Sequence, residues 1–104
     1  MQIPKSVLNN VARHATLLLL SKDPKTRKGA SCILQSLANE GVPLAAINMG
    51  FFHWVDYEKT KNDKIKQLAI QTLMKAPKQE VIDWLVGVAY DTKTLVEFLR
   101  NQDW

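Results

Sequence analysis

The most apolar stretch of the chain covers residues 42–55, where no side chain carries a full charge and only Asn48 and His53 are polar. A helix needs about 20 apolar residues to span a bilayer, so this stretch is too short to form a membrane span. A helix that is apolar around most of its circumference packs inside a protein. The pattern therefore predicts a buried central helix over residues 43–52, which the rest of the chain covers.

The flanking segments repeat apolar residues three and four positions apart, as helices with one buried face do. The predicted helices cover, in chain order, residues 4–21, residues 24–40, residues 57–75, a segment from Pro77, and a short segment after Asp91 or Thr92. We expect residues 101–104 to fray, because chain ends are poorly ordered unless other contacts hold them.

Prolines and caps mark where these helices begin and end. All four prolines lie where a helix could start, at Pro4, Pro24, Pro43 and Pro77. Proline at the first helical position loses no hydrogen bond, because an N–H there would be unpaired. Asp23 offers an N-cap directly before Pro24, and Gly41 offers a left-handed stop for the same helix. The second helix is therefore the best-defined element in the sequence.

Six helices with short connections predict an all-α fold, either stacked helical hairpins or a compact bundle. The 104 residues match the usual size of one domain, so we expect residues 1–104 to form a single helical domain. Its core is expected to bring together Leu18, Ile33, Ile47, Phe51, Leu68, Trp84 and Leu85.

A second interpretation of the middle of the chain gives an α+β domain. Short apolar runs do not separate helix from strand by periodicity alone. Residues 28–35 and 42–48 could therefore pair as a short β-hairpin across residues 39–41.

A local likeness to deoxycytidylate deaminases accompanies this alternative. Residues 21–33 contain Ser-Lys-Asp-Pro-Lys-Thr and then Gly-Ala and Ile, and they resemble the first helix-to-strand passage of that family. Residues 50–56 resemble the loop after its second strand. The family's His-x-Glu has no counterpart in residues 64–72, and its Pro-Cys-x-x-Cys is absent because Cys32 is the only cysteine. The resemblance therefore implies a catalytically dead deaminase-like remnant without zinc chemistry.

A different likeness supports the helical interpretation. Asp23-Pro24, Gly41 and Ala46-Ile47 have the spacing of the Asp-Pro, mid-repeat Gly and Ala-Ile of a tetratricopeptide-type helical hairpin, over about one repeat of 34 residues. The later chain does not repeat this pattern. The likeness agrees with the caps and the apolar periodicity, so the all-α interpretation has the more consistent local signals.

Composition and charge narrow the class of protein. Hydrophobic residues make up 46% and charged residues 23% of the chain, which is ordinary for a soluble globular protein. The N-terminus lacks the features of a signal peptide, so we expect a cytoplasmic protein with no membrane partner. The formal net charge of +4 lies entirely in the first half, where residues 1–50 hold six Lys and Arg against two Asp and Glu. One cysteine excludes an internal disulfide and a cysteine-rich metal site.

Candidate catalytic residues are few. His53 precedes Asp56 by three residues, the spacing of a base and its orienting carboxylate on a helix, but no nucleophile accompanies them. Cys32 is expected to be a small buried side chain, although Arg27 and Lys28 lie one turn away. The sequence therefore predicts a non-enzymatic protein with no cofactor and no metal.

A basic cluster is the first candidate binding site. Lys22, Lys25, Arg27 and Lys28 crowd the start of the second helix, where free N–H groups also favour anions. This cluster, the basic cluster below, is predicted to contact a nucleic-acid backbone or an acidic partner surface. The alternative is that these side chains are only solvated. A helix-turn-helix over residues 37–52 is disfavoured, because its recognition helix offers only Asn48 to read bases.

Aromatic side chains form the second candidate site. Half of the eight aromatic residues lie between residues 51 and 57. Trp54 and Tyr57, at the polar edge of the central stretch, and Trp104 are predicted to anchor a partner protein. The function predicted from the sequence is a small helical binding or regulatory module that acts through a protein partner, while a homo-oligomer would use the same surface and nonspecific nucleic-acid binding is an alternative.

Overall fold

The central apolar stretch forms the longest helix in the computed structural model, which describes residues 4–104 apart from the side chain of Lys5. The helices are α1 (Lys5–Leu18), α2 (Pro24–Asn39), α3 (Pro43–Thr60), α4 (Asp63–Leu73), α5 (Lys78–Gly87) and α6 (Lys93–Arg100). The described residues contain no strand, so the predicted all-α fold of six helices is confirmed. The predicted β-hairpin is wrong, because residues 28–35 lie in α2 and residues 43–48 in α3.

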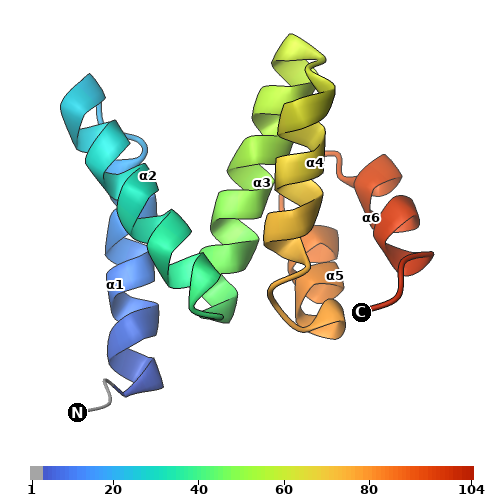
Figure 1. Ribbon diagram of the computed structural model, residues 1–104, viewed down its shortest axis with the longest axis horizontal. Coiled ribbons are helices and arrows are strands. Elements are labelled where there is room, and N and C mark those ends of the chain that lie inside the picture. Colours follow the sequence, from blue (N-terminus) through green and yellow to red (C-terminus); the bar gives the residue numbers. More distant parts are fainter. Residues whose placement is uncertain (1–3) are drawn as a thin grey trace.

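The helices follow one another as three hairpins, α1–α2, α3–α4 and α5–α6 (Figure 1). The α3–α4 hairpin lies in the middle, and α3 also contacts α1, α2 and α5. Stacked hairpins of this kind are one of the two arrangements that the sequence predicts. The deaminase-like remnant requires strands in this region, so it loses its structural basis.

The caps predicted for α2 are confirmed. Asp23 accepts hydrogen bonds from the Lys25 backbone N–H (3.1 Å) and the Thr26 hydroxyl (2.8 Å). Gly41 takes a positive φ of 86° after the helix ends, as a left-handed stop requires. At the tip of the α1–α2 hairpin, α1 ends at Leu18 rather than near residue 21. The backbone N–H groups of residues 19–21 bond to carbonyls three residues back and form a tight turn there.

The central helix continues to Thr60, well beyond the predicted end at residue 52. Gly50 lies inside this helix, where glycine costs about 1 kcal/mol relative to alanine, but a Cβ added at Gly50 would lie 2.5 Å from Leu73 Cγ. The glycine therefore lets α3 and α4 approach closely, which a side chain would prevent. The next helix begins only at Asp63, where the Asn62 side chain accepts a hydrogen bond from the Lys64 N–H (2.9 Å).

The predicted core is confirmed only in part. Ile47 and Leu85 are buried, while Phe51 and Trp84 are half-buried and meet edge to face with ring centroids 5.2 Å apart. The prediction is wrong for three residues that are 40–45% exposed: Leu18, Ile33 and Leu68. The buried apolar residues of α1 and α2 are instead four alanines and one leucine: Ala12, Ala15, Ala30, Ala38 and Leu34.

The C-terminal residues do not fray. The Trp104 indole N–H donates to the Ala76 carbonyl (2.7 Å), and Lys78 Nζ donates to the carbonyls of Arg100 (3.1 Å) and Gln102 (2.6 Å). The same Lys78 Nζ lies 5.5 Å from the centroid of the Trp104 ring. These contacts hold the chain after α6 against the turn between α4 and α5 and the start of α5, so the predicted fraying is wrong.

Candidate functional site

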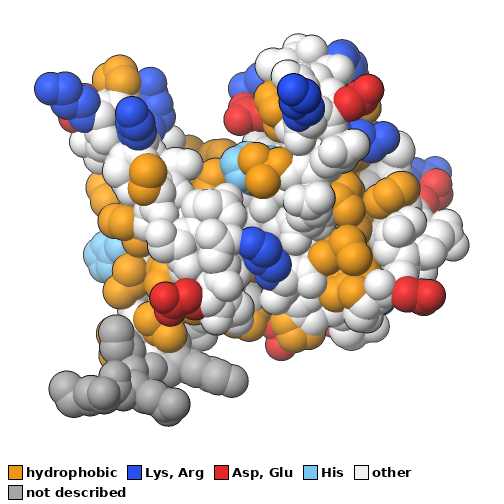
Figure 2. All heavy atoms as spheres, in the orientation of Figure 1, with side chains coloured by type: hydrophobic (Ala, Val, Ile, Leu, Met, Phe, Trp, Pro, Cys, Tyr) orange, Lys and Arg blue, Asp and Glu red, His pale blue; other side chains and the backbone are white. Residues whose placement is uncertain are grey.

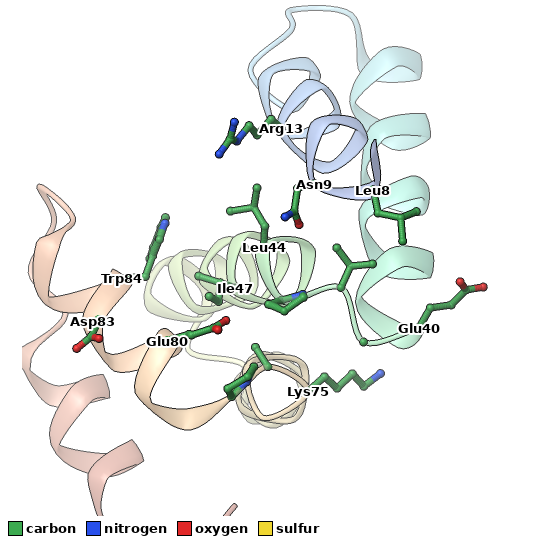
Figure 3. A pocket seen from close by; sticks show the side chains of 15 residues that line it. Leu8, Asn9, Arg13, Glu40, Leu44, Ile47, Lys75, Glu80, Asp83 and Trp84 are labelled. Atoms are coloured by element: carbon green, nitrogen blue, oxygen red, sulfur yellow. The ribbon is translucent and has the colours of Figure 1, made fainter. Parts of the chain in front are cut away.

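A groove of about 1140 Å³ runs between α1 and α5, with the first half of α3 as its floor (Figure 3). The three helices come from three different hairpins. The turn between α2 and α3 and the turn between α4 and α5 close one end, through Gly41 and Pro77 among others. The groove therefore exists only in the folded chain, because its walls are far apart in sequence.

The floor of the groove is apolar. Leu44 and Ile47 lie on α3, Trp84 borders them from α5, and Leu8 of α1 also lines the groove. Ile47 is buried, whereas Leu44, Leu8 and Trp84 are half-buried and pack against the core with part of their surface open. An apolar strip that is already anchored in the core is a rigid surface for a second apolar strip.

The two long sides of the groove carry opposite charge. Arg13 projects from α1, and Glu80 and Asp83 project from α5 on the other side (Figure 3). All three side chains are exposed. At the closed end Lys75 donates to the Asn39 side-chain oxygen, which joins the end of α4 to the end of α2. Along the open part of the groove, the apolar floor thus lies between Arg13 on one side and Glu80 and Asp83 on the other. Glu40 and Lys75 add one charge of each sign at the closed end.

The lining of the groove contains no serine, cysteine or histidine that could act as a nucleophile or a base. Among the described residues no group of three or more His, Cys, Asp and Glu side chains is placed to hold a metal ion.

The predicted basic cluster lies outside the groove, at the turn that joins α1 to α2. Lys22, Lys25, Arg27 and Lys28 are all exposed there. The Arg27 guanidinium donates to the Ser21 carbonyl (2.7 Å) and so braces the turn. Two hydrogen bonds lower the pKa of Asp23. The larger effect comes from the Thr26 hydroxyl and the next from the Lys25 backbone N–H. The structure brings the cluster together, and its contact with an anion stays a prediction.

The three predicted aromatic anchors do not form one surface. Trp54 is buried, so the expectation that it meets a partner is wrong, and its ring packs 5.1 Å from that of Tyr57. Tyr57 is half-buried, with Lys61 Nζ 5.7 Å and Lys66 Nζ 5.5 Å from its ring centroid. Trp104 is half-buried elsewhere, bound to the turn between α4 and α5. These aromatics stabilise the fold.

The histidine that might have served as a base is a link between helices. His53 Nε2 lies 3.3 Å from the Gln35 side-chain oxygen, so the imidazole joins α3 to α2. Burial lowers the pKa of His53, and the charge of Asp56 opposes that shift only in part. Asn48, considered for base readout, is buried and donates to the Thr16 hydroxyl of α1 (2.8 Å). Asn48 is thus enclosed in the fold, whereas His53 keeps part of its side chain at the surface.

Cys32 is exposed on α2, so the expectation of a buried thiol is wrong. The reason lies in the position of the α1–α2 hairpin at one end of the molecule (Figure 1), where one face of α2 has no neighbour. The adjacent Ile33 is exposed for the same reason.

Comparison of the chain with protein-family models, with curated proteins and with solved structures gives no match. None of the described helices is long and apolar enough to cross a bilayer. The case for a function thus rests on the surface of the chain itself, and above all on the groove.

Sequence reasoning missed the groove residues Arg13, Leu44, Glu80 and Asp83. Each looks like an ordinary position on its own helix. The one signal in the sequence was Pro43-Leu44, an apolar helix start directly after a glycine turn, but nothing there indicates that α5 returns to the same place.

Proposed function

We propose that this chain is a non-enzymatic, cytoplasmic binding module that holds an amphipathic helix of a partner protein in the groove between α1 and α5. The observation that carries the proposal is the apolar floor of Leu44, Ile47 and Trp84 between sides of opposite charge. A homo-oligomer would be the special case in which the partner helix belongs to a second copy.

The floor matches the apolar stripe of a helix. Helix-in-groove recognition uses apolar side chains at positions i, i+3 or i+4, and i+7, which reach one side of the helix. Leu44 and Ile47 are themselves one turn apart on α3, and Trp84 extends the same strip on α5. Fully burying one such side chain is favourable by about 1.5–3 kcal/mol, and association costs consume part of the sum. We therefore expect the partner helix to bind the groove reversibly and with moderate affinity.

The charged sides select the partner and its orientation. Arg13 on one side favours an acidic edge on the bound helix, and Glu80 and Asp83 on the other side favour a basic edge. A helix with both edges and an apolar stripe between them satisfies all three residues in only one direction. We expect the reversed charge pattern to be rejected.

Affinity capture with matched variants tests this function. The wild-type chain, a Leu44→Glu variant and a Val86→Glu control serve as bait after nuclease treatment, each checked for a helical circular dichroism spectrum. Val86 is a suitable control because it is 63% exposed and lies outside the groove. We expect the same partner on the wild type and the control, and its loss on Leu44→Glu. Equal capture by all three baits would contradict the proposal.

A second candidate is nonspecific contact between the basic cluster and a nucleic-acid backbone. The supporting observation is that all four cations are exposed on one turn. Such binding weakens with salt, with a log-log slope near 0.9 for each phosphate engaged on duplex DNA. Titration of the wild type and a Lys25→Glu/Lys28→Glu variant against labelled DNA and RNA at two salt concentrations separates this candidate from the groove. Undetectable or salt-insensitive binding would exclude it.

A further inference from the structure

The turn between α1 and α2 exposes leucines as well as cations. In the run Leu17–Leu20, only Leu19 packs against the core. Leu17 is 65% exposed, Leu18 45% and Leu20 72%, the last being the most exposed large apolar side chain among the described residues. We call these three leucines together with the basic cluster the α1–α2 tip.

The tip projects away from the body of the molecule. Figure 1 shows the turn at one extreme of the α1–α2 hairpin, and Figure 2 shows hydrophobic side chains at the end of this protrusion with Lys and Arg side chains around them. The surface is therefore convex, apolar at its apex and positively charged around the apex. Asp23 is the one acidic residue in the turn, and its carboxylate is occupied in capping α2.

The charge of this hairpin is one-sided. Residues 4–39 contain six Lys and Arg and a single Asp, whereas residues 40–104 contain eight Lys and Arg and nine Asp and Glu. The complementary surface must therefore be anionic. A second copy of the chain would bring like charges together at this tip, which disfavours self-association there.

Shape and composition distinguish the anionic surfaces. A nucleic-acid backbone gains nothing from three exposed leucines, since phosphate contacts need only cations and hydrogen-bond donors. A stable protein interface buries about 800 Å² on each partner, so a protein would have to wrap around the convex end of this turn to bind it stably. A lipid surface can hold a protein through a smaller contact area, because apolar side chains enter the headgroup boundary while nearby Lys and Arg contact anionic headgroups.

A second turn lies on the same side of the molecule. The turn between α3 and α4 points in the same direction as the α1–α2 tip (Figure 1), and it exposes Lys61 and Lys64 around Asp63. A flat surface that meets the tip can therefore also meet these two lysines. A planar charged surface is what such an arrangement fits.

We propose that the α1–α2 tip docks this protein peripherally on an anionic lipid surface, with Leu17, Leu18 and Leu20 entering the headgroup boundary and the basic cluster contacting anionic headgroups. The proposal departs from the sequence-based expectation of no membrane partner, which considered only spanning segments and placed Leu18 in the core. It does not depend on the groove, so either proposal can fail while the other stands.

Co-sedimentation of the full chain with vesicles tests it. Vesicles of phosphatidylcholine alone are compared with vesicles of phosphatidylcholine and phosphatidylserine. We expect binding only to the mixed vesicles, weakening as salt is raised because exposed charges are screened. A Lys25→Glu/Lys28→Glu variant should bind at least about 30-fold more weakly, since each cation near an anionic surface contributes about five-fold. A Leu17→Gln/Leu20→Gln variant should bind at least about ten-fold more weakly.

A Val86→Gln control, which removes an equally exposed apolar side chain on α5, should bind like the wild type. All changed residues are exposed, so a preserved helical circular dichroism spectrum is expected for every variant. Three results would overturn the proposal: no sedimentation with the mixed vesicles, unchanged binding by the leucine variant, or displacement from the vesicles by a modest concentration of duplex DNA.

Discussion

The α1–α2 and α3–α4 hairpins each consist of two helices of 11–18 residues, but the helices pack differently in the two hairpins. In the α3–α4 hairpin, Gly50 and the fully buried Leu73 bring the two helices into close contact. In the α1–α2 hairpin, Leu34 is the one large apolar side chain that is fully buried, and the other buried apolar residues are alanines. Val7, Val11, Leu18 and Ile33 are exposed by 41–45%. The hairpin with neighbours on both sides exposes only Leu68 (40%) among its large apolar side chains, whereas the hairpin at the end of the stack keeps one apolar face for other contacts.

The largest expected contrast comes from leucine truncation. Leu73→Ala should lower the free energy of unfolding by about 2–5 kcal/mol, because it removes a fully buried side chain and leaves a cavity. Leu18→Ala, at a 45% exposed position on α1, should cost less than about 1 kcal/mol. Chemical denaturation of both variants measures the difference. Equal losses would mean that Leu18 belongs to the core, as the sequence predicts.

Glycine substitution sharpens the same comparison. Gly50→Ala should destabilise the protein by about 1–3 kcal/mol through overpacking against Leu73, despite the better helix propensity of alanine. Gly29→Ala on α2 meets nothing within 4 Å and should raise stability by up to about 1 kcal/mol. Thermal unfolding should therefore shift in opposite directions for the two variants. A shift in the same direction would show that the α3–α4 contact is looser than described.

A buried polar contact joins the two hairpins. Asn48 donates to the Thr16 hydroxyl, which in turn donates to the Ala12 carbonyl (2.8 Å each). In a double-mutant cycle of Asn48→Ala and Thr16→Val, we expect a coupling energy of about 1 kcal/mol, the usual contribution of one hydrogen bond. Additive losses would indicate that the hairpins are joined by apolar packing alone.

The smallest effect concerns pH. Burial lowers the pKa of His53 in the folded state, so the unfolded chain binds more protons in this range. Stability should therefore be complete above the ordinary histidine pKa of about 6.5 and decline as pH falls below it. A His53→Gln variant, which keeps a polar partner for Gln35, should lose that part of the decline. An identical pH profile for both proteins would refute the assignment.

Local signals in the sequence are sufficient to predict which residues form helices, but not which residues those helices contact in the fold. Asp23, Pro24 and Gly41 define α2 through contacts within a few residues, so its limits could be predicted. The length of α3 could not, because Gly50 weakens an isolated helix and its advantage appears only against Leu73 of the next helix. Periodicity identified an apolar face on α1 but could not show that half of this face has no partner within the chain.

The binding surfaces were the least predictable part. The basic cluster is contiguous in sequence and could be found there, whereas the groove joins Arg13 of the first hairpin to Glu80 and Asp83 of the third. The position of Trp54 at the polar edge of the central stretch predicts exposure, yet α3 continues past it and the side chain is buried in the core. Composition alone does not separate an aromatic anchor from a core aromatic.

Site-specific photo-crosslinking is the most direct test of whether a partner helix lies in the groove. p-Benzoylphenylalanine replaces Leu44 on the floor of the groove in one variant and the exposed Val86 in a control, and both are irradiated in cells. If a partner helix lies in the groove, we expect a discrete crosslinked protein from position 44 and no such product from position 86. The product should be lost when Arg13→Glu is added. Crosslinking of the same product from both positions, or none from position 44, would contradict the proposal.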